Sequence, residues 1–139
     1  MIKTELAIVG AGPAGLSAAI EARKTGVDVL LIDENARPGG QLFKQIHKFF
    51  GSNEHKAGTR GLNIGTELLD ESKKLGINTW LKGEVCGIEG GHNLWVVLDR
   101  SYSEIVKAKK IILATGATEN AVSFSGWDLP GVMGAGAAQ

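Results

Sequence analysis

The chain has 139 residues, the size of a single domain, and its 15 basic and 15 acidic side chains cancel to a net charge of zero. This balance excludes a general attraction to nucleic acid or to an anionic membrane surface, and no apolar run approaches the roughly 20 residues of a membrane span. The single cysteine, Cys86, excludes an intrachain disulfide and agrees with the cytoplasmic location that we expect.

The chain begins with the pattern of a β-α-β unit. Residues 5–9 form a short apolar run typical of a buried parallel strand, and glycines follow it at once. Residues 13–25 predict a helix, because Pro13 is tolerated in a first turn and Gly26 gives a stop signal. Residues 27–33 predict a second buried strand, which a right-handed crossover connects to the first.

Three glycines with the spacing G-x-G-x-x-G lie between the first strand and the helix. Gly10 permits a tight turn, Gly12 lets a pyrophosphate approach the backbone, and Gly15 lets the helix lie close to the sheet. The N–H groups and the partial positive charge of a first helical turn favour a diphosphate. We therefore predict a dinucleotide site here and assign to it Gly10, Ala11, Gly12, Pro13, Ala14 and Gly15.

An acidic pair closes the second predicted strand. Asp33 lies where a carboxylate can accept hydrogen bonds from ribose hydroxyls and would repel a 2′-phosphate. We prefer Asp33 as the ribose ligand because it ends the apolar run, and its neighbour Glu34 is the alternative. The pair predicts an adenine dinucleotide without a 2′-phosphate.

The segment after the acidic pair departs from a simple NAD-binding domain. A loop, RPGGQ, precedes a predicted helix on which Leu42, Ile46, Phe49 and Phe50 share one face. A second helix is expected over residues 61–75.

Strands dominate the next part of the chain. Residues 77–81 predict a third parallel strand, and residues 84–89 and 93–99 predict a hairpin around the turn GGHN. A further antiparallel strand is expected over 103–108, and a buried parallel strand that ends in a glycine turn over 109–117.

This layout resembles the FAD domain of the two-dinucleotide-binding flavoproteins, the superfamily of glutathione reductase and thioredoxin reductase. The segments RPGGQL, LATGATEN and GWDLPGVMGAGAAQ are most similar to the FAD/NAD-binding subunits of opine oxidase, hydrogen cyanide synthase and bacterial amine or imino-acid dehydrogenases. The chain lacks the cysteine pair with which disulfide reductases act, so disulfide reduction is not expected.

The resemblance implies an α/β fold: a Rossmann-like parallel sheet with helices on both faces and a small antiparallel meander, an incomplete FAD domain of the glutathione reductase type. We expect an FAD-binding domain over residues 1–117, with the antiparallel insertion at about 83–108. Residues 118–139 would be a Gly/Pro-rich linker toward an absent second domain, which would hold NAD(P).

The resemblance also implies further cofactor contacts. Gly40 and Gln41 would lie beside the flavin end of FAD, and Val85 would offer backbone groups to adenine. A second short fingerprint, where the backbone passes near FAD, would be formed by Ala114, Thr115 and Gly116.

The expected function is that of an FAD-dependent oxidoreductase domain, the flavin-binding part of a dehydrogenase or oxidase acting on an amine-type substrate or on NAD(P)H. The alternative is a non-catalytic dinucleotide-binding or assembly module that forms a site only with other chains. No side chain has the setting of a catalytic acid or base, and no group of residues has metal-ligand spacing, so we assign neither. Without a closing strand, residues 111–116 would present a hydrophobic free edge, which predicts a homo-oligomer or a partner subunit through that edge or through the Gly-rich tail.

Overall fold

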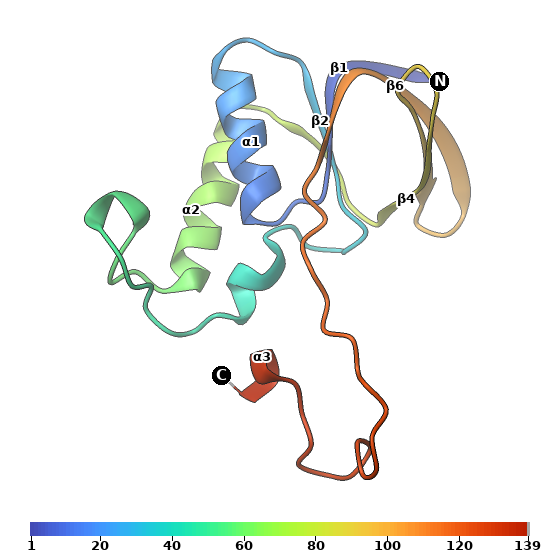
Figure 1. The fold of residues 1–139 in the computed structure, drawn as a ribbon. Helices are drawn as coiled ribbons and strands as arrows, with labels where there is room; N and C mark the ends of the chain where they lie inside the picture. The colour runs from blue at the N-terminus through green and yellow to red at the C-terminus, as the bar shows by residue number, and fades with distance from the viewer. Residues whose placement is uncertain (139) are drawn as a thin grey trace.

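Six strands form one sheet in the order β3-β2-β1-β6-β5-β4 (Figure 1). The structure, a computed structural model, describes residues 1–138. The strands are β1 (Ile2–Val9), β2 (Val29–Ile32), β3 (Asn78–Trp80), β4 (Gly83–Glu89), β5 (Asn93–Leu98) and β6 (Tyr102–Leu113). β1 pairs in parallel with β2 and β6, and β2 with β3, whereas β4, β5 and β6 pair antiparallel. The predicted β-α-β unit, third parallel strand and hairpin are thereby confirmed.

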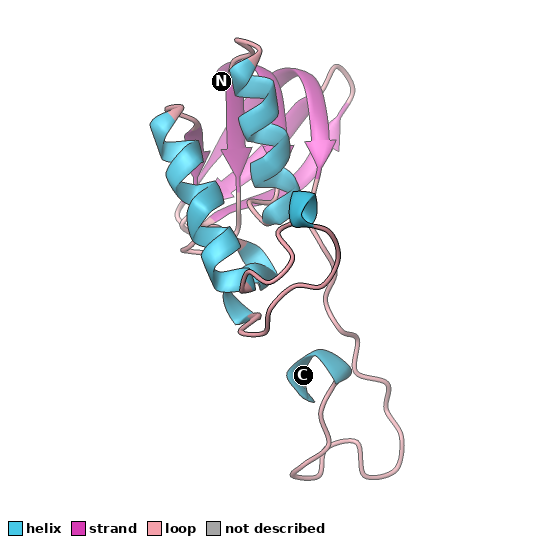
Figure 2. Ribbon diagram, turned by 90° about the vertical axis from the view of Figure 1, so that its left-hand side faces the viewer, coloured by secondary structure: helices cyan, strands magenta, loops and turns pink. Residues whose placement is uncertain are grey.

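Two α-helices cover one face of the parallel strands. They are α1 (Pro13–Lys24) and α2 (Gly61–Lys74), both at the predicted places, and they lie side by side in front of the sheet in Figure 2. Because successive side chains of a strand point to opposite faces, Leu6 and Ile8 of β1 face these helices. They pack there with Leu16 and Ile20 of α1.

The other face of the parallel strands is covered by the antiparallel strands. Ala7, Val9, Leu30 and Ile32 pack there against Leu94, Val96, Leu98, Val106 and Ala108. The α/β fold with its meander is confirmed, but the expected placement of helices on both faces is corrected. The meander bends over and buries the second apolar face, which otherwise needs a helix to cover it.

Strand β6 is one continuous strand of 12 residues. Its first part, from Tyr102 to Lys107, pairs with β5, and from Val106 onward it pairs with β1. The sequence predicted two strands here, 103–108 and 109–117. That prediction was wrong because no glycine or proline between 102 and 113 turns the chain, so one strand serves both the meander and the parallel sheet.

The helix predicted from Leu42 to Phe50 does not form. The structure has two short 3₁₀-helices instead, η1 (Gly40–Lys44) and η2 (Asn53–His55), and Phe50 is 92% exposed. Glycines with positive φ on both sides, such as Gly51, favour turns over a helix. The chain doubles back instead, because the N–H of Phe49 donates to the carbonyl of Thr59 over 2.9 Å.

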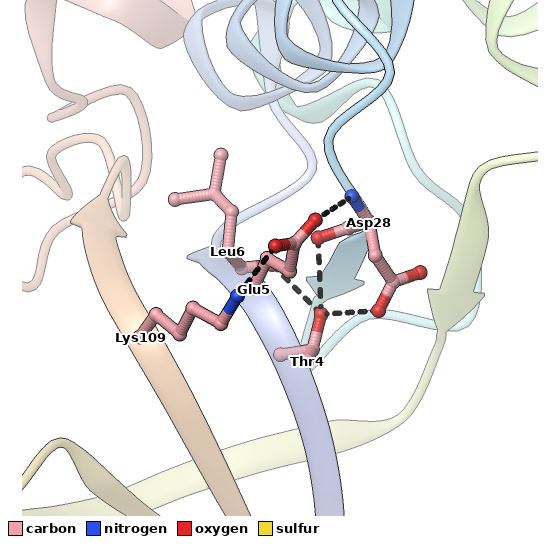
Figure 3. A network of polar contacts seen from close by, with 5 residues as sticks. All are labelled: Thr4, Glu5, Leu6, Asp28 and Lys109. Carbon is pink, nitrogen blue, oxygen red and sulfur yellow. Dashed lines mark hydrogen bonds and ion pairs between the residues drawn. The ribbon is translucent and has the colours of Figure 1, made fainter.

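A polar network joins β1 and β6 to Asp28, the residue that precedes β2 (Figure 3). Glu5 accepts a hydrogen bond from Lys109 over 2.7 Å and a second from the N–H of Asp28 over 3.1 Å. The bond from Lys109 is the larger cause that holds the pKa of Glu5 below its ordinary value, and the Asp28 N–H adds to it. The stability from this pairing is complete above the ordinary glutamate pKa and is lost as the pH falls through the lowered pKa.

The last part of the chain leaves the sheet. Residues 114–138 form no strand, and they extend away from the sheet and helices to the one-turn helix α3 (Ala135–Ala138) (Figure 1). Apolar side chains along it, such as Val122 and Leu129, are exposed. Gln139, the last residue of the predicted linker, lies outside the described residues. Within residues 1–138, no helix is both long and apolar enough to span a lipid bilayer.

Candidate functional site

The carboxyl ends of three neighbouring strands meet at the glycine turn. The N–H of Gly10, just after β1, donates to the carbonyl of Ile32 at the end of β2 over 2.7 Å. The N–H of Ala114, just after β6, donates to the carbonyl of Val9 over 2.8 Å. Ligands of parallel sheets collect at such an edge, so the two predicted fingerprints lie where a cofactor is expected.

Two glycines of the fingerprint are required by the fold itself. Gly10 has a φ of +102°, and a Cβ there would overlap the carbonyl oxygen of Ala114. A Cβ at Gly15 would overlap the carbonyl oxygen of Gly10. These two glycines let α1 and the segment after β6 close on the end of β1.

Gly12 differs from the other two glycines. Its φ of −74° suits any residue, and apart from its own chain neighbours no atom of the described chain lies within 4 Å of where its Cβ would be. Gly12 precedes the first turn of α1, which contains no acidic residue. The packing of the described residues therefore gives no reason for a glycine here, and open space adjoins the start of the helix.

The start of α1 carries unpaired backbone donors. Within residues 1–138, the N–H groups of Gly12, Ala14 and Gly15 have no acceptor, and Pro13 has no N–H to satisfy. The N–H of Ala11 is different, because it donates to Asp33. Free donors at a helix start suit an anion, and a phosphate can approach closely where Gly12 has no side chain.

The side chain of Asp33 is committed to the protein. It is 7% exposed, and its Oδ2 accepts the Ala11 N–H over 2.6 Å. Its Oδ1 accepts the backbone N–H of Asn35 over 2.8 Å and the side-chain amide of Asn35 over 2.9 Å. Asp33 therefore fixes the glycine turn to the end of β2.

Glu34 is the other member of the acidic pair. It is exposed, and within the described part of the chain it makes no hydrogen bond or ion pair. Glu34 is thus a carboxylate without a partner in the described chain, and the choice between Asp33 and Glu34 as the ribose ligand stays a prediction.

The Gly-Gly turn of RPGGQ lies on the fingerprint. The N–H of Gly39 donates to the carbonyl of Ala11 over 2.6 Å. A Cβ on Gly40, whose φ is +53°, would lie 3.0 Å from the Cα of Gly12. Gly40 is thus brought to the site, and the exposed Gln41 follows it.

The second fingerprint reaches the site through its first residue. Ala114 lies against Gly10, and its Cβ would be 3.5 Å from a Cβ on Gly15. Thr115 and Gly116 follow it and are exposed, and Gly116 has a φ of +72°.

Val85 lies on the strand that begins beside the acidic pair. The N–H of Gly83, the first residue of β4, donates to the backbone carbonyl of Asp33 over 2.8 Å. Val85 comes two residues later, is half-buried against the core under the meander, and pairs with Val96 of β5. A contact between its backbone and adenine stays a prediction.

Sequence reasoning missed the role of Asn35. It donates twice to Asp33 and so holds that carboxylate in place. The sequence carried a signal for this, because an aspartate often accepts the backbone N–H two residues later in an Asx turn. The segment Asp33-Glu34-Asn35 fits that pattern.

Comparison with known families shows the group of proteins to which this chain belongs. A family model described as pyridine nucleotide-disulphide oxidoreductase matches residues 4–137. The chain belongs to the pyridine nucleotide-disulphide oxidoreductase family. The resemblance seen in the sequence is confirmed, and the chain is a domain of an FAD-dependent oxidoreductase family.

Individual proteins show similarity along nearly the whole chain. One of the subunits of opine oxidase from Agrobacterium tumefaciens (strain Ach5) is 34% identical over 97% of this chain and 28% of its own length. The HcnB subunit of hydrogen cyanide synthase from Pseudomonas aeruginosa is 38% identical over 91% of this chain and 27% of its own length. The chain thus spans about a quarter of the length of these relatives.

A solved structure has a similar fold over nearly the whole chain. The crystal structure of L-proline dehydrogenase from P. horikoshii matches with a TM-score of 0.79 and 27% identity. The match covers 94% of this chain and 26% of that one.

Proposed function

We propose that this chain is the FAD-binding part of an oxidoreductase, with the FAD diphosphate beside Gly12 at the start of α1. The observation that carries the proposal is the open space at Gly12. Gly10 and Gly15 are explained by close contacts within the chain, whereas the space beside Gly12 is open and lets a ligand approach its backbone.

The residues around this space fit the parts of an adenine dinucleotide. The N–H groups of Gly12, Ala14 and Gly15 are available to diphosphate oxygens. The free carboxylate of Glu34 is available to ribose hydroxyls, while Asp33 holds the turn that presents the N–H groups. When FAD is bound it supplies the hydride chemistry, and these residues bind and orient it.

Three other segments have cofactor roles that stay proposals. Gly40 and Gln41 are proposed to lie beside the flavin end of FAD, and the close approach of Gly40 to Gly12 supports their nearness to the cofactor. The protein backbone from Ala114 to Gly116 is proposed to pass near FAD, and the contact of Ala114 with the glycine turn supports this. Val85 is proposed to contact adenine through its backbone.

Ligand analysis of the purified chain tests the cofactor. We expect FAD, or ADP as its binding fragment, to be identified by mass spectrometry after denaturation, or to bind in titration calorimetry. NADP should bind more weakly, because Glu34 would repel a 2′-phosphate. If neither FAD nor ADP binds, the proposed function is wrong.

The substrate of the whole protein is proposed from the relatives. The similarity to opine oxidase and to L-proline dehydrogenase supports an amine- or amino-acid-type substrate as the electron donor. The alternative electron donor is NAD(P)H. An NAD(P) site would then lie in a second domain. A non-catalytic assembly module would hold a flavin that does not bleach when such substrates are added, and nothing in the comparisons favours that alternative.

The free part of β6 is proposed as an association surface. From Lys109 to Leu113, β6 pairs with β1 on one side, and within residues 1–138 no strand pairs with its other side. Leu113 is 64% exposed beside this edge. The naming of the relatives as enzyme subunits supports pairing with a different chain or with a second copy here.

We expect the chain to form a dimer or a larger assembly at micromolar concentration, measured by light scattering. Leu113→Lys should shift the assembly toward monomer, because a charge on an edge strand opposes pairing. A monodisperse wild-type monomer whose amides after Lys109 exchange freely would contradict this proposal. A cytoplasmic location also stays a proposal, supported by the free thiol of Cys86.

A further inference from the structure

Two glycines occupy one face of helix α2. Gly61 and Gly65 are four residues apart, so they lie one above the other, and both are buried. A glycine inside a helix costs about 1 kcal/mol relative to alanine. The position of Gly65 therefore calls for a packing reason.

The 3₁₀-helix η1 lies directly on these glycines. A Cβ on Gly65 would be 3.2 Å from Cζ of Phe43 and 3.4 Å from Cβ of Leu42. A Cβ on Gly61 would be 2.8 Å from Cβ of Gln45. The absence of side chains on this face of α2 thus sets how deeply η1 sits against the helix.

The other side of η1 adjoins the dinucleotide site. The ring of Phe43 lies so close to Gly39 that a Cβ there would overlap its Cε2 atom. Gly39 in turn donates to the carbonyl of Ala11, and Gly40 lies on Gly12. The Phe43 ring is therefore a spacer between Gly65 of α2 and the Gly-Gly turn.

We propose that Phe43 and Gly65 are positioning residues that set the distance between the Gly39–Gly40 turn and Gly12, and thereby the affinity for the dinucleotide. This inference rests on the proposed function. Neither residue is assigned a contact with the cofactor. Any side chain at Gly65 pushes the Phe43 ring toward Gly39, and the displaced turn narrows or tilts the space beside Gly12.

The test uses Gly65→Ala, with Asn63→Ala on the exposed surface of the same helix as the matched control. Both changes raise helix propensity, so neither should reduce the helix's own stability. We expect Gly65→Ala to weaken binding of ADP and FAD by about three- to thirty-fold in titration calorimetry, whereas Asn63→Ala leaves it unchanged. In the ligand-free chain, the Gly39 amide should exchange faster in Gly65→Ala than in wild type.

A second variant and a rescue separate positioning from simple loss of packing. Phe43→Leu removes the ring beside Gly39 and should also weaken binding, even if Gly65→Ala does not fold. The double variant Gly65→Ala with Phe43→Leu should bind more tightly than either single variant, because the new methyl group occupies space that the ring leaves.

The outcomes distinguish this inference from the proposed function. If wild type binds FAD or ADP and Gly65→Ala binds equally well, the positioning role is wrong and the proposed function stands. If thermal unfolding changes but affinity and Gly39 exchange do not, the role is only structural and the inference is also wrong. If wild type binds neither ligand, the proposed function fails and this inference fails with it.

Discussion

Gly12→Val should fold like the wild type and lose dinucleotide binding. Its φ of −74° suits valine, and apart from its own chain neighbours no chain atom lies within 4 Å of the new Cβ, so stability should change little. The branched side chain would fill the space proposed for the diphosphate. We expect affinity for FAD and ADP to fall by at least about 100-fold, or ~2.7 kcal/mol, in titration calorimetry. Circular dichroism and thermal unfolding should match the wild type.

The other two fingerprint glycines provide the contrast. Gly15→Ala should prevent correct folding, because its Cβ would overlap the carbonyl oxygen of Gly10. Gly10→Ala should do the same through the carbonyl of Ala114 and its positive φ. Unchanged affinity in a folded Gly12→Val variant would remove the diphosphate from the proposed site.

Asp33→Asn and Glu34→Gln should differ in their effect on folding stability, although the residues are neighbours and both variants should bind the dinucleotide less tightly. In Asp33→Asn, an NH₂ group replaces one of two acceptor oxygens and meets a donor, either Ala11 N–H or Asn35. A buried hydrogen-bond partner lost in this way costs about 1–3 kcal/mol, so the free energy of unfolding measured with urea should fall by that amount. Dinucleotide affinity should fall as well, because the glycine turn loses its tether.

Glu34→Gln should leave the free energy of unfolding within about 0.5 kcal/mol of wild type, as is usual for an exposed residue without partners. Its affinity for ADP should nevertheless fall by about 1–3 kcal/mol, the range for a hydrogen bond to a charged group. If Glu34→Gln binds ADP with wild-type affinity, and Asp33→Asn is stable but does not bind, then Asp33 is the ribose ligand and the assignment to Glu34 is wrong.

Local sequence patterns sufficed for the parts of this chain whose structure depends on near neighbours. The β-α-β unit, helix α2 and the hairpin of β4 and β5 follow from apolar runs and glycine turns. The spacing of apolar residues from 42 to 50 also fitted a helix. This spacing takes no account of the glycines on either side, which favour turns over a helix. Phe50 is therefore solvent-exposed instead of buried on a helix face.

The amino-acid sequence by itself determined that a glycine turn follows β1 and that an acidic pair follows β2, because both are set by residues close together in the chain. Only the tertiary structure decided which acid is free. The pairing of β1 with β2 brings the Ala11 N–H to Asp33, 22 residues away, while Glu34 stays exposed. Likewise, the parallel strands are apolar on both faces, so both faces must be buried. The apolar pattern does not say whether helices or antiparallel strands bury each face, because that depends on the path of the chain after the strands.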